Sequence, residues 1–336
     1  MVNTFYKSFR ADDRSYFSLI KKDVHATVSS AGFDEVRVGK VDIIVSEITS
    51  NLSKHAKGGE LLVGIGRDTF GAYIEVISLD EGPGIPDIGR VMSDGYSSTT
   101  TLGHGLGSIK RLSDLFDVYS VKDWGTILVS RVYKEEQPGF KRRRLECRGI
   151  NVPKRGELVS GDGFCYEETS AGFRILIADG LGHGPDANEA VRQACEAFKA
   201  CTEESSTETI RYIHSQIRKT RGIVGLVVVY NSQTRSWKTT GVGNIAARWM
   251  GASNTRNHVS YNGIIGYNIP ATMNEQLMSQ EEFPQFIACS DGIKSRWDIA
   301  KFPMLMQHDG MIIASALYKE FSRGTDDTSV LVCKSV

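Results

Sequence analysis

The stretch that most constrains the fold of this 336-residue chain is residues 178–184, Ala-Asp-Gly-Leu-Gly-His-Gly. It follows an apolar run at 173–177 that predicts a strand, and a helical pattern starts near Pro185. The glycines allow a tight turn, so the Asp179 carboxylate and the Gly180 carbonyl can face one cation. Mg²⁺ or Mn²⁺ suits such oxygen ligands. For this heptapeptide alone, an ordinary glycine-rich turn is the alternative.

Three further acidic positions favour the metal hypothesis. Asp162 lies in Ser-Gly-Asp, Asp291 follows an apolar strand pattern, and Asp326 with Asp327 opens the last predicted strand, 328–333. Each acid is at the edge of a predicted strand, and a β-sandwich could gather them at one end. The pattern therefore predicts a metal centre built from acids that are far apart in the sequence.

At these positions the chain resembles the PPM-type metal-dependent protein phosphatases, in particular their bacterial SpoIIE/RsbX branch, over most of residues 145–335. The resemblance implies an α-β-β-α sandwich and a centre of two Mg²⁺ or Mn²⁺ ions, which activate water and neutralise the phosphoryl oxygens. Asp179 would be the catalytic ligand that bridges both ions. The remaining implied ligands are the Gly180 carbonyl, Asp162, Asp291 and Asp326.

One detail of the predicted phosphatase domain differs from the family pattern, and the role of one residue has two interpretations. The usual ending Asp-Asp-x-Thr is here Asp326-Asp327-Thr328-Ser329, which retains the ligating acid. His183 would be a catalytic proton donor or a phosphate contact, and a histidine with a structural hydrogen bond is the alternative. Helical patterns are expected here at about 186–201 and 207–220, with strands at 223–230, 237–240, 245–250 and 286–288.

The first part of the chain carries a second set of functional residues. An apolar stripe from about residue 36 to 56 predicts a core-facing helix, and Glu47, Asn51 and His55 line one flank of it. A solvated polar face is the alternative for Glu47 and Asn51 alone. Strand patterns follow at 60–66 and 72–79.

A strand-end acid and two glycine-rich segments come next. Asp80, before the turn Glu81-Gly82-Pro83-Gly84, could accept a hydrogen bond from an adenine amino group. The segment Gly103-His104-Gly105-Leu106-Gly107 opens a helix pattern, and phosphates bind well at a helix N-terminus. Gly125-Thr126 precedes a final strand. This ordered set indicates a nucleotide site more strongly than one G-x-G-x-G alone.

The order resembles the GHKL (Bergerat) ATP-binding fold over most of residues 5–133. The closest likeness is to RsbT-type serine/threonine kinases, through residues 80–88 and Asp94-Gly95-Tyr96-Ser97, with the anti-sigma kinases RsbW and SpoIIAB next. The resemblance implies that Asn51 holds one Mg²⁺ on ATP, Glu47 is the catalytic base, Asp80 reads adenine and Thr126 supports it. The implied nucleotide-binding glycines are Gly82, Gly84, Gly103, Gly105 and Gly107. His104 lies at a position of this glycine-rich segment where an aliphatic residue is commoner in the family.

The amino-acid composition restricts the classes of protein to which this chain can belong. The 40 basic and 40 acidic residues argue against a general nucleic-acid binder. Six cysteines show no metal-ligand spacing and fit reduced thiols. No apolar run is long enough to span a membrane, and we expect a cytoplasmic protein. The basic run Lys141-Arg142-Arg143-Arg144 is most simply a solvated hinge.

We therefore expect an α+β chain of two domains: a GHKL kinase domain at 1–136, a basic linker at 137–144 and a PPM-type phosphatase domain at 145–336. The implied partner is a STAS-domain antagonist protein that one domain phosphorylates and the other dephosphorylates. A sigma factor or a downstream phosphatase is an alternative partner, and a homodimer is left open. Two rival functions are a phosphatase with an ATP-sensing GHKL domain and an anti-sigma module fused to a phosphatase.

Overall fold

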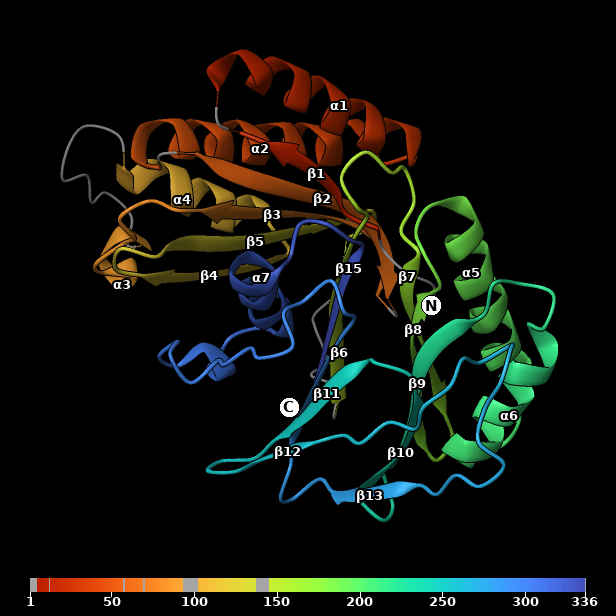
Figure 1. Ribbon diagram of the computed structural model, residues 1–336. Helices are drawn as coiled ribbons and strands as arrows, with labels where there is room; N and C mark the ends of the chain where they lie inside the picture. The colour runs from red at the N-terminus through yellow and green to blue at the C-terminus, as the bar shows by residue number, and fades with distance from the viewer. Residues whose placement is uncertain are drawn as a thin grey trace. The chain divides into compact units, whose positions relative to one another are not determined.

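The computed structural model describes residues 5–11, 13–56, 58–68, 70–92, 102–136 and 145–335 (Figure 1). The chain forms two compact units, one of Tyr6–Lys141 with Ile299–Lys319, and one of Met1–Phe5 and Arg142–Asp298 with Glu320–Val336. The expected linker at 137–144 lies outside the described residues, as does the Asp94-Gly95-Tyr96-Ser97 segment. The predicted domain boundaries on either side of this linker therefore stay predictions.

The first unit contains one antiparallel sheet with strand order β1-β2-β3-β5-β4. Its strands are β1 (Lys7–Arg10), β2 (Gly59–Asp68), β3 (Gly71–Asp80), β4 (Leu115–Val121) and β5 (Gly125–Tyr133). Its helices include η1 (Arg14–Tyr16), α1 (Phe17–Ser30), α2 (Glu35–His55), α3 (Ile88–Met92) and α4 (Leu102–Leu112). Helices α1, α2 and α4 lie over one face of the sheet, as expected for the α/β sandwich (Figure 1).

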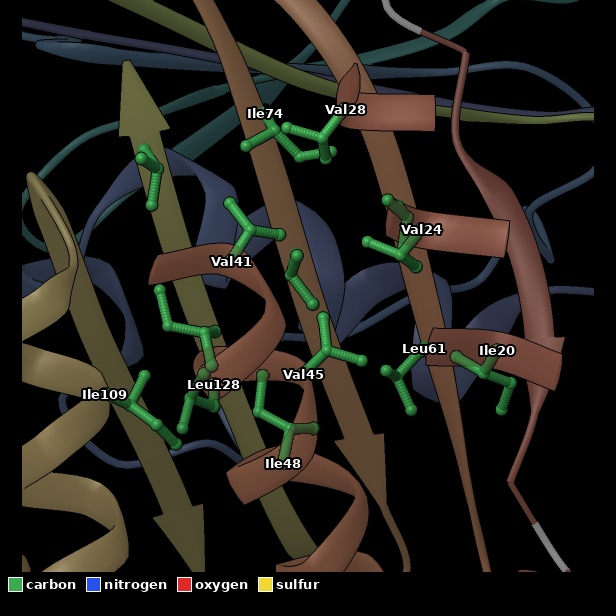
Figure 2. Close-up of a cluster of buried hydrophobic side chains, with 14 of the residues drawn as sticks. Ile20, Val24, Val28, Val41, Val45, Ile48, Leu61, Ile74, Ile109 and Leu128 are labelled. Carbon is green, nitrogen blue, oxygen red and sulfur yellow. The ribbon is translucent and has the colours of Figure 1, made fainter. Parts of the chain in front are cut away.

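Helix α2 forms where the apolar stripe predicted it. Asp34 caps its first turn by accepting a hydrogen bond from the Arg37 backbone N–H at 2.7 Å. Its buried stripe packs with α1, α4 and the sheet, as Figure 2 shows for Val41, Val45 and Ile48. Full burial of one such side chain contributes about 1.5–3 kcal/mol. The core therefore fixes which flank of α2 is left for polar residues.

The second unit contains two antiparallel sheets with a shared core. One sheet has the order β13-β10-β9-β8-β7 and the other β12-β11-β14-β15-β6. Side chains of both sheets, among them Trp237, Trp249 and Phe286, form one buried cluster. Helices α5 (Pro185–Ala200) and α6 (Ser206–Gln216) pack on the first sheet through a second cluster. The strands are β6 (Leu145–Val152), β7 (Asp162–Thr169), β8 (Gly172–Gly180), β9 (Ile223–Asn231), β10 (Ser236–Val242), β11 (Ala246–Met250), β12 (Thr255–Asn257), β13 (Gln276–Ser279), β14 (Gln285–Cys289) and β15 (Thr328–Ser335).

The segment Ile299–Lys319 groups with the first unit, although 145–336 was expected to form one domain. It contains η2 (Leu305–Gln307) and most of α7 (Gly310–Phe321), a helix that the sequence patterns did not predict. Residues 310–317 are all buried, and a helix that is apolar all round lacks the periodicity that marks an amphipathic helix. Such a helix can be missed, and its sequence does not show which sheet it covers.

Contacts within the first unit hold this segment on the sheet. Asp117 on β4 contacts the His308 ring at 3.0 Å and accepts the Asp309 backbone N–H at 2.9 Å. Trp124, between β4 and β5, packs against Phe302 with the two rings tilted and their centroids 4.9 Å apart. None of the helices that the structure describes has the length and apolar character needed to cross a membrane.

Candidate functional site

Glu47 and Asn51 lie one turn apart on α2, at the start of α4. A β-carbon at position 105 would be 2.9 Å from Glu47 Oε2 and 3.3 Å from Asn51 Oδ1, so glycine allows the two helices to approach closely here. Gly103 and Gly105 are in the first turn of α4, and Gly107 follows in the second. The first backbone N–H groups of a helix lack intrahelical acceptors and attract anions. The side chain of His104 is outside the described residues.

The C-terminal end of α2 brings this flank close to the turn after β3. A β-carbon at Gly82 would be 2.9 Å from the His55 carbonyl oxygen and 3.0 Å from Asp80 Oδ1. His55 is partly buried, and its Nε2 makes no hydrogen bond to the described residues. Burial lowers the pKa of His55. The predicted residues of α2 and of the Asp80 turn therefore belong to one region of the unit.

Hydrogen bonds to one of its two carboxylate oxygens fix the Asp80 side chain. Its Oδ1 accepts the Gly82 N–H at 2.8 Å and the Thr126 N–H at 3.1 Å. Gly125, with φ of 114°, lets the next strand approach, since a β-carbon there would be 1.9 Å from the Asp80 carbonyl oxygen. Burial raises the pKa of Asp80. No hydrogen bond from the described residues ends on Oδ2, which leaves this oxygen for a ligand donor.

Sequence patterns missed two residues near Asp80. Ser120, opposite Thr126 in the β4–β5 register, lies 3.0 Å from Thr126 Oγ1 and accepts the Ile85 N–H at 2.8 Å, so it ties the Gly84 turn to β5. Gly84, with φ of 78°, permits the chain to pass Val121. Lys319 on α7 donates to the Trp124 carbonyl at 2.9 Å, and its positive charge offsets part of the rise that burial causes in the pKa of Asp80. The hairpin register could have indicated Ser120, whereas no sequence signal indicates Lys319.

In the second unit, Asp162 and Asp179 are direct partners across β7 and β8. Opposed residues of antiparallel strands place their side chains close together on one face. The pKa of Asp179 is raised to about 8, mainly because the side chain is buried and to a smaller extent because of the negative charges of Asp291, Asp326 and Asp327. Asp162 is 2% exposed, and its Oδ2 has no hydrogen-bond partner among the described residues. The acids predicted from the sequence therefore meet at one edge.

The two consecutive aspartates before β15 have different surroundings. Asp327 is buried and uses both oxygens, accepting the Lys154 N–H at 2.7 Å and the Gly161 N–H at 2.9 Å. Asp326 is exposed, and among the described residues its carboxylate accepts only the Asp327 N–H, at 3.0 Å. Asp326 is thus the acid of the pair with oxygens available for a cation. Asp291 is also exposed, and Asn244, which the patterns missed, donates to its Oδ2 at 3.0 Å.

Divalent cations fit this acidic edge. No three His, Cys, Asp or Glu side chains of the described residues are already placed to hold a metal ion. Mg²⁺ does not require such a cage, because it keeps several waters and binds through one or two carboxylates. A cation here would satisfy the orphaned Oδ2 of Asp162 and remove the repulsion that raises the pKa of Asp179. The Gly180 carbonyl, at the end of β8, is at the same edge.

His183 lies in the turn between β8 and α5, and it is exposed. Its Nδ1 is 2.7 Å from Glu157 Oε1, an ion pair when the ring is protonated. Glu157 was not among the predicted residues. The contact orients the imidazole and leaves Nε2 for another partner, which is compatible with both predicted readings of His183.

The first unit of the chain is similar in sequence to known proteins. Residues 9–131 match the family described as "Histidine kinase-like ATPase domain". "Serine/threonine-protein kinase RsbT" of Bacillus subtilis (strain 168) is 38% identical over 95 residues, which are 28% of this chain and 71% of that kinase.

Two solved structures resemble a larger part of the chain. A chain from "The bacterial stressosome: a modular system that has been adapted to control secondary messenger signaling" has a TM-score of 0.53 at 24% identity and covers 57% of this chain and 100% of its own. RsbX in complex with magnesium has a TM-score of 0.51 at 18% identity and covers 59% of this chain and 98% of its own. At these identities the likeness establishes a fold. The chain therefore belongs to the RsbT serine/threonine-protein kinase family and carries, in addition, a unit with the PPM-type fold of RsbX.

Proposed function

We propose that this chain is a bifunctional partner-switching protein. Its first unit would phosphorylate a Ser or Thr of a STAS-domain antagonist protein with MgATP, and its second unit would remove phosphate from the same or a related protein. The observation that carries the proposal is an acidic edge, where burial and three neighbouring acids raise the pKa of Asp179, on a phosphatase fold in the same chain as an RsbT-type kinase unit. Opposing activities in one chain would set the phosphorylation level of the partner.

In the kinase unit, each residue would have a separate task. Asp80 Oδ2 would accept a hydrogen bond from the adenine amino group, while Gly82 and Thr126 fix Oδ1. Asn51 would hold the Mg²⁺ on ATP, which supplies charge neutralisation when bound. Glu47 would orient the substrate hydroxyl and take its proton. Positioning and neutralisation account for most of the catalysis in phosphoryl transfer.

In the phosphatase unit, Asp162, Asp179, Asp291, Asp326 and the Gly180 carbonyl would hold two Mg²⁺ or Mn²⁺ ions. Such ions lower the pKa of bound water and neutralise phosphoryl oxygens. Asp179 would be one of these ligands, and a cation beside it would offset the repulsion from Asp291, Asp326 and Asp327 that raises its pKa. His183, oriented by Glu157, would donate a proton to the leaving group or contact the phosphate.

The partner would be a STAS-domain phosphoprotein in the cytoplasm, and the signalling context a bacterial stress response. Membrane and nucleic acid are not expected as partners. A sigma factor, a downstream phosphatase and a second copy of the chain remain testable partners. Two rival functions are a phosphatase with an ATP-sensing first unit, and an anti-sigma module fused to a phosphatase.

Radiolabelled ATP incubated with candidate STAS proteins would separate these functions. The Asp179→Asn chain should accumulate labelled STAS protein, because the kinase works unopposed. The parent should label it less, and Asn51→Ala should not label it. A first unit that only senses ATP would give no label in any variant. An anti-sigma module would retain a sigma factor on a column of the chain and give no labelled STAS protein.

A further inference from the structure

Cys147 on β6 and Cys333 on β15 form a close thiol pair, several residues along β15 from the aspartates that precede this strand. The two residues are directly opposite in the antiparallel register, and their Sγ atoms are 2.7 Å apart. Opposed residues of an antiparallel pair have Cα atoms about 4.5–5.5 Å apart, within the range of about 4.4–6.8 Å that a disulfide spans. A bond between them would therefore need no movement of the backbone. Both thiols are free.

The two thiols differ in access. Strand β6 is the last strand of its sheet, and Cys147 is partly exposed on it. Cys333 is 0% exposed and belongs to the core between the two sheets. Burial and the hydrogen bond with Cys147 raise the pKa of Cys333, which keeps it a thiol. An oxidant from solvent would reach Cys147 first, with Cys333 beside it to resolve the product.

We propose that Cys147 and Cys333 are a reversible redox pair that a hydroperoxide converts into a cross-strand disulfide. The Cys147 thiolate attacks a peroxide oxygen, the O–O bond breaks, and one water leaves as the sulfenic acid forms. The Cys333 sulfur then displaces the hydroxyl of the sulfenic acid as a second water. In total, two thiols and one hydrogen peroxide give one disulfide and two waters. The two sulfurs lose two electrons and the peroxide gains them, and a dithiol reverses the change.

The bond would fix the beginning of an edge strand. Strand β6 starts at Leu145, two residues before Cys147, and pairs with β15 along its full length. A cross-link at this end would prevent β6 from separating and would close a long loop, which restricts the unfolded chain. The thermal midpoint of the second unit should then rise by about 5–10 °C.

A second cysteine pair serves as a matched control. Cys165 on β7 and Cys195 on α5 are hydrogen-bonded to each other, but they are 0% and 1% exposed. Solvent peroxide cannot reach this pair in the folded protein. Burial raises the pKa of Cys165, which slows its oxidation further.

The test is peptide mapping of the full chain after hydrogen peroxide, without reduction, together with thermal unfolding. We expect a Cys147–Cys333 peptide as the main product, loss of two hydrogens per chain, a raised midpoint and full reversal by dithiothreitol. Cys147→Ser and Cys333→Ser should each remove the linked peptide and the rise, whereas Cys195→Ser should retain both. Recovery of Cys147 as a sulfinic or sulfonic acid beside a free Cys333 thiol would overturn the proposal. A linked Cys165–Cys195 peptide as the main product would also overturn it.

Discussion

Asp80 and Asp179 both lie at the end of a strand, yet their surroundings suit different ligands. Asp80 receives two backbone N–H groups on one oxygen and has the other available to a donor. Asp179 lies among Asp291, Asp326 and Asp327, whose charges raise its pKa together with burial. A carboxylate with fixed donors can recognise an amino group, whereas clustered carboxylates require a cation. The neighbours, more than the residue type, distinguish the two sites.

Asp179→Asn should abolish metal-dependent phosphatase activity and leave the fold intact. Because burial and charge raise the folded pKa of Asp179 to about 8, above its unfolded value, the stability it contributes at low pH is lost as pH rises through about 8. The metal-free variant should therefore have a higher thermal midpoint than the parent above about pH 8. Asp327→Asn is the matched control. It should cost about 1–3 kcal/mol, because both oxygens of Asp327 accept backbone N–H groups. Equal thermal midpoints for the metal-free parent and Asp179→Asn above about pH 8 would contradict the proposed repulsion between Asp179 and its neighbouring acids.

Added Mg²⁺ or Mn²⁺ should stabilise the second unit more strongly as pH rises toward about 8. A metal ligand must lose its proton, so binding releases protons and becomes tighter until Asp179 is ionised. Thermal midpoints with metal and with chelator, measured across this pH range, would check the trend. The gain should disappear in Asp179→Asn. A metal-dependent gain that does not change with pH would exclude Asp179 as a ligand.

At the scale of elements, sequence patterns predicted the parts with clear periodicity. Helix α2 has an apolar stripe and an Asp34 cap, and the strands that carry Asp80 and Asp179 alternate or are continuously apolar. The same patterns failed for α7, whose burial on all sides removes the periodic signal. They also missed Ser120, Asn244 and Glu157, because a side chain that supports a site through tertiary contacts has no local pattern. The acids at the strand ends were predictable, whereas their supporting neighbours were not.

Gly105→Ala should impair phosphotransfer without unfolding the kinase unit. The new methyl group would be 2.9 Å from Glu47 Oε2, the end of a flexible side chain that can turn away. Stability should change little, while displacement of Glu47 should lower the phosphotransfer rate about tenfold or more. Gly39→Ala, also in a helix, is the control, since a β-carbon there meets no atom within 4 Å. It should raise stability by about 1 kcal/mol and keep the rate. An unchanged rate in Gly105→Ala would refute the proposed role of Glu47.

At the scale of the whole molecule, the order of the chain and its compact units do not coincide. The sequence places Ile299–Lys319 between two predicted metal ligands, Asp291 and Asp326, whereas the fold groups this segment with the kinase unit. The segment makes polar contacts with Asp117 and Glu60 through His308 and Tyr318. Its aromatic side chains pack against Tyr119 and Trp124. Since Lys319 also binds the Trp124 carbonyl, next to Gly125 and Thr126, the segment supports the hairpin that holds Asp80.

A fragment that ends at Pro138 should therefore be an incomplete kinase unit. Without Ile299–Lys319, Asp117 loses the His308 ring and the Asp309 N–H, and Trp124 loses Phe302 and Lys319. We expect a lower thermal midpoint than that of the kinase unit in the full chain, and weaker ATP binding by calorimetry, because the β4–β5 hairpin positions Thr126 against Asp80. His308→Ala in the full chain should reproduce part of the loss in midpoint, since it removes the Asp117 contact and the edge-on stacking with Tyr119. If the fragment keeps both the midpoint and the ATP affinity, the segment adds nothing to the kinase unit and a linear division near residue 138 is correct.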